Sequence, residues 1–420
     1  MNDREKRILV YADWTHDGPT LIGELYASVS KGRETFSFAY DKGWLSHGTA
    51  CFSLDPDLAL YQGRQFVPLD KPLFGLFADS CPDRWGRLLM RRREAVNARK
   101  EQRKPKQLAE SDYLLGVYDE ARMGALRFSV SEGGPFLAWD RALATPPWTT
   151  LRELETAAYA FEQDDDSLNE KWLNQLLAPG SSLGGARPKA TVQAPDGALW
   201  IAKFPSKHDD YNAGAWEMVV HDLALQCGLR VPEARLETFS KNGGTYLVKR
   251  FDRQNGKRVH FASAMTLLGK VDGAAADDGT GYLDLAAFIR QSGASPKEDL
   301  AELWHRVVFT MAVSNTDDHL RNHGFLLTPT GWRLSPMFDV NPSIYGDSLS
   351  LNVSAEDNSI SFELALETAA YYGLMLSDAR EHLEKIKDVV SQNWKSAAKG
   401  HGLSRSAIEF MEPAFEMAYK

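Results

Sequence analysis

The chain changes character near residue 260, and this change constrains its fold more than any other feature. Before that point, short alternating apolar segments are separated by turns that contain glycine, proline or asparagine, a pattern typical of β-strands. Beyond it, apolar residues recur mostly at helical spacing. Strands followed by helices predict an α+β fold, and a chain of 420 residues is expected to form two or three lobes or domains.

We expect three parts along the chain, and Pro135, Pro146 and Pro147 mark a boundary before the second. The expected parts are a β-rich N-terminal subdomain (1–130), a β-rich lobe with one helix (150–252) and a helical lobe (253–420). Helices are predicted at 83–104, as a pair at 151–178, at 213–227, and as two or three helices within 363–419. Turns between paired strands are predicted at 195–197 and 242–244, and a hairpin at 323–334.

One further helix has a well-marked start. Ser295 is a suitable N-cap, Pro296 occupies the first helical position, and Glu298 can close a capping box. Apolar residues then recur at helical spacing as far as Met311. The pattern predicts a helix that ends near Ser314 and leads into a polar segment.

Composition and charge exclude several classes of protein. A hydrophobic content of 43% and a charged content of 25% are those of a soluble globular chain, and no apolar run is long enough to span a bilayer. The net charge of −9 gives no overall attraction to nucleic acid, although residues 84–106 are strongly basic. That segment is either a solvated basic helix or a surface that lies close to DNA.

The three cysteines, Cys51, Cys81 and Cys227, lie far apart and lack the spacing of metal ligands. They predict neither a disulfide framework nor a zinc site, and they suit a reducing cytoplasm. The N-terminal segment has no apolar region of a signal peptide. We therefore expect a cytoplasmic protein that does not contact a membrane.

Several segments have, in order, the parts that phosphoryl transfer needs. Glycines at 184–185 could let backbone N–H groups approach an anion, or could form an ordinary turn. Lys203, at the end of the strand after them, could reach nucleotide phosphates or extend into solvent. Glu217, on the helix of this lobe, could hold that lysine or be a solvated helix charge.

The polar segment at 314–322 is the candidate catalytic loop. Asp317 and Asn322 have the Asp-x₄-Asn spacing of a kinase catalytic loop, with a solvated turn as the alternative. His319 could carry a proton or hold the loop by hydrogen bonds. Asp339 follows the predicted hairpin, where a kinase places a metal-binding aspartate, although the sequence has neither DFG nor HRD. The ordered set predicts an ATP- and Mg²⁺-dependent phosphotransferase.

Longer segments resemble the HipA family of kinase toxins over nearly the whole chain. Residues 74–86 resemble the N-terminal signature of the family, and residues 112–117 with 124–128 resemble the end of that subdomain. Residues 182–189 resemble its phosphate loop, and 316–322 resemble its TD-x-H-x-x-N motif. The resemblance implies a two-lobed, protein-kinase-like α+β fold with a β-rich N-terminal subdomain and an all-helical C-terminal lobe.

The resemblance also implies a role for each matching position. Asp317 and Asn322 would be catalytic, and Asn322 and Asp339 would bind Mg²⁺. Ser182 would be autophosphorylated, with the adjacent Ser181 as the alternative. ATP would contact seven positions, namely Gly184, Gly185, Ala186, Lys203, Glu217, Lys249 and Phe251.

The partners are implied by the same resemblance. The chain would be a serine/threonine kinase and the toxin of a toxin–antitoxin system, with a helix-turn-helix antitoxin of the HipB type and DNA bound only through that antitoxin. Its substrate would be a protein, such as a translation factor or an aminoacyl-tRNA synthetase. Two alternatives stay open: a catalytically silent chain that binds an antitoxin–DNA complex, and a kinase of a small molecule. The family pattern is not followed at Lys249, where glutamate is common, or at 260–264, which replace a Gln-Glu-Asp stretch.

Overall fold

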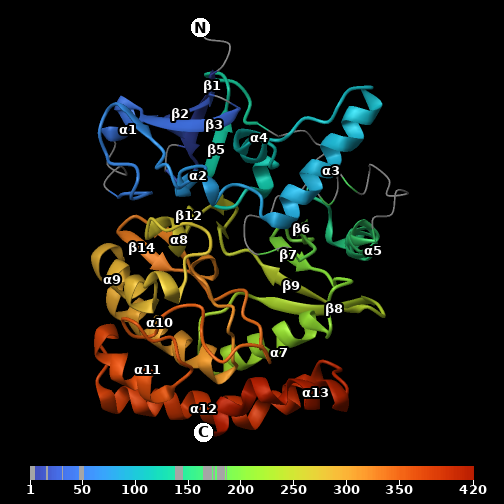
Figure 1. The fold of residues 1–420 in the computed structure, drawn as a ribbon, viewed down its shortest axis with the longest axis vertical. Coiled ribbons are helices and arrows are strands. Elements are labelled where there is room, and N and C mark those ends of the chain that lie inside the picture. Colours follow the sequence, from blue (N-terminus) through green and yellow to red (C-terminus); the bar gives the residue numbers. More distant parts are fainter. Residues whose placement is uncertain are drawn as a thin grey trace. The chain divides into compact units, whose positions relative to one another are not determined.

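The chain forms two compact units, and Figure 1 labels most of their helices and strands. The structure is a computed structural model and describes residues 5–15, 18–30, 32–46, 52–137, 145–163, 173, 176, 185 and 187–420. Unit 1 comprises Met1–Ser206 and Arg250–Ala262, and unit 2 comprises Lys207–Lys249 and Ser263–Lys420. Helices and strands both contribute to the chain, so the predicted α+β class is confirmed. The finer division into three parts stays a prediction.

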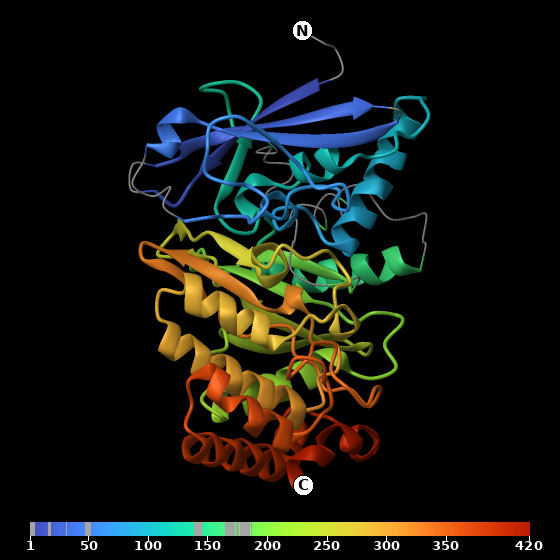
Figure 2. The same ribbon diagram turned by 60° about the vertical axis from the view of Figure 1, so that its left-hand side comes forward.

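Unit 1 contains an antiparallel five-stranded sheet with the strand order β4-β3-β2-β1-β5. Its strands are β1 (Glu5–Ala12), β2 (Thr20–Ser30), β3 (Arg33–Tyr40), β4 (Arg64–Phe66) and β5 (Leu126–Ser129). Figure 2 shows β1, β2 and β3 in blue as long neighbouring strands. Val10 of β1 pairs with Phe128 of β5, so the last strand closes the sheet from a distant part of the sequence.

Aromatic side chains from the sheet and the following helices form the core of unit 1. The ring centroid of Phe77 lies 5.4 Å from that of Phe38 and 6.3 Å from that of Phe128, and all three rings are buried. Burial of such rings is a large favourable contribution to folding. The helices described in this unit are α1 (Lys42–Leu45), α2 (Gly75–Ala78), α3 (Arg84–Lys100), α4 (Glu110–Leu115) and α5 (Leu151–Glu162).

The basic segment of the sequence forms helix α3, as predicted, and Asp83 anchors its start. One carboxylate oxygen of Asp83 accepts a hydrogen bond from the N–H of Gly86 at 2.8 Å. The other accepts one from Nζ of Lys189 at 2.8 Å, and both charged side chains are almost fully buried. Because a buried charge is costly unless it is paired, this ion pair fixes α3 to the strand that begins at Lys189.

Two small hairpins complete the strands of unit 1. Strand β6 (Lys189–Gln193) pairs antiparallel with β7 (Leu199–Lys203), and the turn between them contains Gly197 at a φ of +84°. This confirms the turn predicted at 195–197. The short strands β10 (Arg253–Gln254) and β11 (Lys257–Arg258) form the second hairpin.

Unit 2 is mainly helical and includes two hairpins. Its strands are β8 (Ala234–Ser240), β9 (Gly243–Lys249), β13 (Gly324–Thr328) and β14 (Gly331–Leu334), and β12 (Phe261–Ser263) ends where this unit resumes. Its helices are α7 (Ala213–Gln226), α8 (Ala264–Leu267), α9 (Tyr282–Ser292), α10 (Pro296–Ala312), α11 (Phe362–Thr368), α12 (Leu376–Gly400) and α13 (Arg405–Met411). Helix α10 is the centre of the core, and Nε1 of Trp304 donates to the carbonyl of Ala365 at 2.8 Å.

The predicted start of α10 is correct in position but wrong in its capping. The helix begins at Pro296, yet the Ser295 side chain makes no capping hydrogen bond. Glu298 does not close a capping box, because its carboxylate is 3.0 Å from the guanidinium of Arg333. A salt bridge across to the β13–β14 hairpin therefore replaces the local contact that the sequence pattern predicted.

The other predicted elements of unit 2 are confirmed. Helix α7 matches the prediction at 213–227, the β13–β14 hairpin matches 323–334, and α11, α12 and α13 account for 363–419. Of the helix pair predicted at 151–178, α5 is present and the second helix lies outside the described residues. None of the helices in the described ranges has the length and apolar character that crossing a membrane requires.

Candidate active site

A polar segment, residues 314–322, follows α10 in unit 2. The N–H of Asn315 donates to the carbonyl of Thr310 at 2.9 Å, and Ser314 has a φ of +48°. A residue other than glycine rarely adopts this left-handed conformation, which is found preferentially at functional sites. The segment then brings Asp317 to the surface, where its side chain is exposed.

The structure brings Asp317 and Asn322 together, the two residues predicted to be catalytic. Nδ2 of Asn322 donates to the backbone carbonyl of Asp317 at 3.3 Å. This bond orients the amide, and the Oδ1 atom of Asn322 is buried without a hydrogen-bond partner in the described part of the chain. A buried amide oxygen without a partner is costly, so it needs either a water molecule or a ligand.

Asp318 has the opposite environment to its neighbour Asp317. It is buried and accepts hydrogen bonds from the hydroxyl of Tyr282 at 2.6 Å and from Nε2 of His323 at 3.0 Å. Burial raises the pKa of Asp318, but the charge of His323 and the two hydrogen bonds outweigh burial and leave that pKa below its ordinary value. Asp318 therefore anchors the candidate loop to α9 through its hydrogen bond with Tyr282.

Sequence reasoning missed Tyr282 and His323 as supports of this loop. Tyr282 is a helix residue far from the loop in the sequence, and no local pattern connects the two. His323 directly follows Asn322, so its position beside the Asp-x₄-Asn spacing was a usable signal. The predicted supporting residue, His319, contacts Nη2 of Arg321 through its Nε2 atom at 3.3 Å.

Asp339 lies after β14, as predicted, and has an unusual backbone. Its φ is +59°, in the left-handed region, and its side chain is half-buried. The N–H of Met337 donates to the carbonyl of Arg230 at 2.7 Å and holds the segment that leads to Asp339. A strained backbone at this position indicates that the surrounding contacts fix the direction of the carboxylate.

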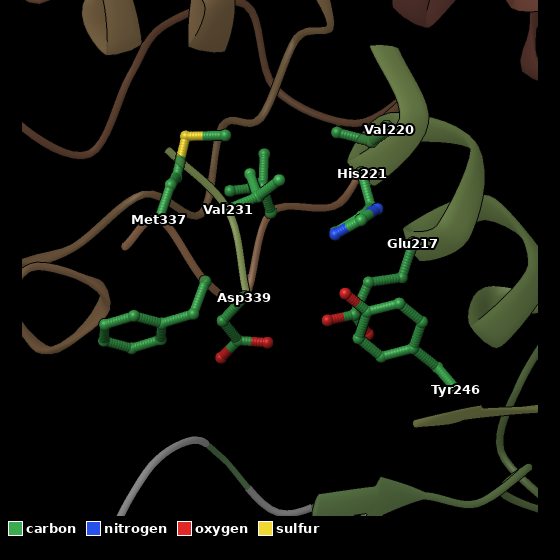
Figure 3. Close-up of a pocket in the computed structure, with 9 residues that line it drawn as sticks. Glu217, Val220, His221, Val231, Tyr246, Met337 and Asp339 are labelled. Carbon is green, nitrogen blue, oxygen red and sulfur yellow. The ribbon is translucent and has the colours of Figure 1, made fainter. Parts of the chain in front are cut away.

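Asp339 and Glu217 line the same pocket, which Figure 3 shows. Their carboxylates point toward each other, and the ring of Tyr246 lies beside Glu217. The pocket has a volume of about 20 Å³, room for about one water-sized group. Its described lining consists of Glu217, Val220, His221, Val231, Tyr246, Met337, Phe338, Asp339 and Val340.

The pKa of Tyr246 reports the charge in this pocket. Burial raises the pKa of Tyr246 well above its ordinary value of 10, and the negative charges of Glu217, Asp339 and Asp222 raise it further. Two carboxylates that face each other repel unless a cation lies near them. Glu217 and Asp339 thus both contribute negative charge beside the buried hydroxyl of Tyr246.

Hydrogen bonds join the segment after Asp339 to the candidate catalytic loop. The N–H of Asn341 lies 3.5 Å from Oδ1 of Asn315, and the N–H of Ser343 donates to the carbonyl of Ser314 at 3.1 Å. The start of the loop and the segment that carries Asp339 are thus held to each other.

The remaining predicted site residues divide between the two units. Lys203 is buried at the end of β7 in unit 1, whereas Glu217 is buried on α7 in unit 2, so their pairing stays a prediction. Lys249 ends β9 and forms an ion pair with Glu233 at 3.2 Å. The ring of Phe251 lies 6.1 Å from that of Phe261, both in unit 1.

The predicted phosphate loop is described only in part. Gly185 is exposed, and its carbonyl accepts a hydrogen bond from Nζ of Lys189 at 3.3 Å. Ser181, Ser182, Gly184 and Ala186 lie outside the described residues, so their predicted roles stay predictions. Lys189, which the family pattern places at the end of this loop, is committed to its ion pair with Asp83.

Two of the predicted site residues carry oxygen donors of the kind that Mg²⁺ binds. Among the described residues, no three His, Cys, Asp or Glu side chains form a cluster for a metal. Mg²⁺ prefers oxygen ligands and uses few protein side chains, since water and phosphate supply the rest. The amide oxygen of Asn322 and the carboxylate of Asp339 are donors of that kind.

The comparisons with known proteins identify the family. Residues 181–394 match the family described as the HipA-like C-terminal domain, a stretch of just over half the chain. The chain belongs to this HipA-like family. Lys203, Glu217 and the candidate catalytic loop all lie within the matched region.

The chain is also similar to curated proteins named as kinases and to one solved structure. Two Sinorhizobium fredii proteins match, "Putative kinase Y4mE" with 28% identity over 40% of this chain and "Putative kinase Y4dM" with 27% identity over 48%. The chain spans about half the length of these curated relatives, 44% and 53%. HipA from the Shewanella oneidensis complex of HipA, HipB and operator DNA has a similar fold, with a TM-score of 0.64 and 17% identity over 98% of this chain and 96% of that one.

Proposed function

We propose that this chain is an ATP- and Mg²⁺-dependent serine/threonine protein kinase that acts as the toxin of a toxin–antitoxin system. The observation that supports this most strongly concerns Asn322. Its amide nitrogen is bound to the backbone of Asp317, and its buried amide oxygen has no hydrogen-bond partner in the described part of the chain. An open oxygen donor beside an exposed carboxylate suits the transfer of a phosphoryl group to a hydroxyl.

In this proposal, Asn322 and Asp339 hold Mg²⁺ on the phosphates of ATP. Bound Mg²⁺ would neutralise the charge that develops on the transferred phosphoryl group. Glu217 contributes by position, because its carboxylate shares the pocket of Asp339 and can hold the amine of a lysine or another cation. Both ligands are oxygen donors, which matches the preference of this ion.

Asp317 would orient the acceptor. Its carboxylate is exposed and has no ion pair in the described part of the chain, so it can receive a hydrogen bond from a serine or threonine hydroxyl. As the hydroxyl oxygen forms its bond to the γ-phosphorus, the bond from that phosphorus to the β–γ bridging oxygen breaks. The hydroxyl proton passes to Asp317, and ADP leaves with the electron pair of the broken bond.

Other residues would bind the nucleotide. Lys203 would supply a positive charge to the phosphates, with Glu217 holding its amine in place. Gly184, Gly185 and Ala186 would supply backbone N–H groups to the same phosphates. Lys249 and Phe251 would lie near adenine, a role that rests only on their match to the family pattern.

The toxin role and its partner rest on the family. The structural neighbour from Shewanella oneidensis is a HipA in complex with HipB and operator DNA. We propose a HipB-type helix-turn-helix antitoxin as partner here, a cytoplasmic location, and a protein substrate in translation. The net charge of −9 gives the chain no overall attraction to DNA, so the proposed contact with DNA is made through the antitoxin.

Calorimetry with ATP tests the metal site. The wild-type protein is expected to bind ATP with Mg²⁺ and much more weakly without it. Asp339→Asn should weaken binding in the presence of Mg²⁺ by about tenfold or more, because it removes a charged ligand of the metal. Lys203→Ala should do the same, because it removes a positive charge that compensates the phosphates. Asp388→Asn, which changes an exposed aspartate of α12, should bind like the wild type. Wild-type affinity in Asp339→Asn would remove Asp339 from the metal site.

Peptide mass spectrometry tests autophosphorylation. After incubation with Mg²⁺-ATP, we expect a phosphate on Ser182 and weaker binding of fresh ATP by the modified protein. A phosphoserine has a charge of about −1.5 to −2, which would repel the triphosphate beside it. Ser182→Ala should lose the modification, and Ser181→Ala should keep it. A protein that phosphorylates a substrate but gains no phosphate at either serine would refute self-regulation and leave the kinase proposal standing.

A further inference from the structure

A surface groove lies where α11 is joined to α12. It has a volume of about 440 Å³. A short 3₁₀ turn, Ala369–Tyr372, connects the two helices. Leu366, Leu374 and Leu376 supply apolar surface to the groove, and Glu363, Glu367 and Arg380 supply charge. No residue of the proposed kinase site lines this groove, so the kinase proposal does not account for the groove.

Hydrogen bonds hold the elements that form the groove. The carbonyl of Ala365 in α11 accepts a hydrogen bond from Nε1 of Trp304 in α10 at 2.8 Å, which fixes α11 on α10. Within α11, the hydroxyl of Thr368 donates to the same carbonyl at 3.0 Å. Arg290 donates to the carbonyl of Tyr371 and fixes the connecting turn. Gly373 then reverses the chain with a φ of +74°, a conformation that favours glycine. A preformed groove binds a partner with little loss of conformational entropy.

Large apolar side chains protrude beside the groove. Tyr371 is 56% exposed, Met375 is 67% exposed and Leu376 is 50% exposed, and they are close neighbours in the sequence. Single exposed apolar residues are ordinary, but a group of them next to a hollow is typical of a surface that another chain covers. The face thus offers both a hollow and the apolar side chains that could fill such a hollow.

The charges on this face also occur with both signs. In the described part of the chain, the side chains of Glu367 and Arg380 form no hydrogen bond or ion pair. The carboxylate of Glu363 accepts a hydrogen bond only from the hydroxyl of Ser361, at 3.2 Å. A surface with acidic and basic groups that lack partners, and with both hollow and protruding apolar parts, is complementary to itself. Contact through a two-fold axis requires this property, because both copies use the same surface. If one residue of the first copy contacts a second residue of the other copy, the reverse contact is made as well.

We propose that this face binds a second copy of the same chain through a two-fold axis. Met375 and Leu376 of one copy would enter the groove of the other, and Arg380 of each copy would face Glu367 of its partner. The mixture of charges favours a second copy over an anionic lipid surface, since the two glutamates would repel anionic headgroups. The inference does not rest on the proposed kinase function.

Analytical ultracentrifugation of the full chain tests this proposal by charge reversal. The wild type is expected to change from monomer to dimer as its concentration rises over a roughly hundredfold range. Arg380→Glu and Glu367→Arg should each shift the transition to at least about tenfold higher concentration, because each places like charges opposite one another. The double variant, Arg380→Glu with Glu367→Arg, should regain dimerisation because both contacts are restored with exchanged signs.

A charge reversal elsewhere on α12 is the matched control. Lys399→Glu changes an exposed residue near the other end of the helix and should dimerise like the wild type. The three substituted positions, Glu367, Arg380 and Lys399, are all exposed, so circular dichroism should show an unchanged fold. A wild type that stays monomeric over the whole range, a dimer that ignores both single reversals, or a double variant that remains monomeric would overturn the proposal.

Discussion

At the scale of single residues, the two adjacent aspartates of the candidate loop have separate tasks. Asp317 is exposed, and only its backbone carbonyl receives a hydrogen bond, from Asn322. Asp318 is buried between Tyr282 and His323. One carboxylate is therefore available to a substrate, and the other is committed to the structure. Because the two side chains are chemically identical, the same substitution at each position compares only their environments.

Replacement of each aspartate should affect a different property. Asp318→Ala leaves His323 and Tyr282 buried without their acceptor, which should lower the free energy of unfolding by roughly 2–4 kcal/mol. Asp317→Ala should change it by less than about 0.5 kcal/mol, as is usual for surface substitutions. Urea unfolding at pH 7 measures both. Equal losses of stability in the two variants would show that the assignment of roles to these carboxylates is wrong.

At the scale of elements, two histidines lie at the contact between α10 and α12. The ring centroids of His305 and His382 are 4.3 Å apart. Burial lowers the pKa of His305 from its ordinary value of 6.5 to about 4, and the nearby charges of His382 and Lys385 act in the same direction, against Glu302. The folded protein therefore binds a proton at His305 more weakly than the unfolded chain does.

The lowered pKa predicts a loss of stability in acid. The contribution of neutral His305 to the free energy of unfolding is fully present above pH 6.5. It is lost as the pH falls toward 4, since the unfolded chain takes up the proton first. We expect a cost of about 1–3 kcal/mol over that interval. His305→Gln should remove that part of the pH dependence, and His208→Gln, at an exposed position, should retain it. Unfolding curves at several pH values that coincide for wild type and His305→Gln would contradict this assignment.

Elements with local signals were predictable from the sequence, and those with distant partners were not. Helix α7 and the β13–β14 hairpin follow from apolar periodicity and from glycine at their ends. The capping of α10 was predicted wrongly because Glu298 pairs with Arg333, a residue of another element. Spacing in the sequence cannot show such a competitor.

At the scale of the whole molecule, the sequence predicted which two residues meet in the candidate loop but not how the neighbouring pocket is built. The Asp-x₄-Asn spacing places Asp317 and Asn322 in one loop, because five residues cannot separate far. The meeting of Glu217, Tyr246 and Asp339 in one pocket depends on how α7, β9 and the segment after β14 pack. The same holds for the pairing of β1 with β5, which joins distant parts of unit 1.

The central claim is that Asp317 serves phosphoryl transfer, and its most direct test is turnover of ATP labelled in the γ-phosphate. With Mg²⁺, the wild type should transfer label to protein hydroxyl groups. Asp317→Asn should be slower by about a hundredfold or more, with unchanged ATP affinity and unfolding. Transfer at the wild-type rate by Asp317→Asn, or no transfer by a wild-type protein that binds Mg²⁺-ATP, would contradict the account.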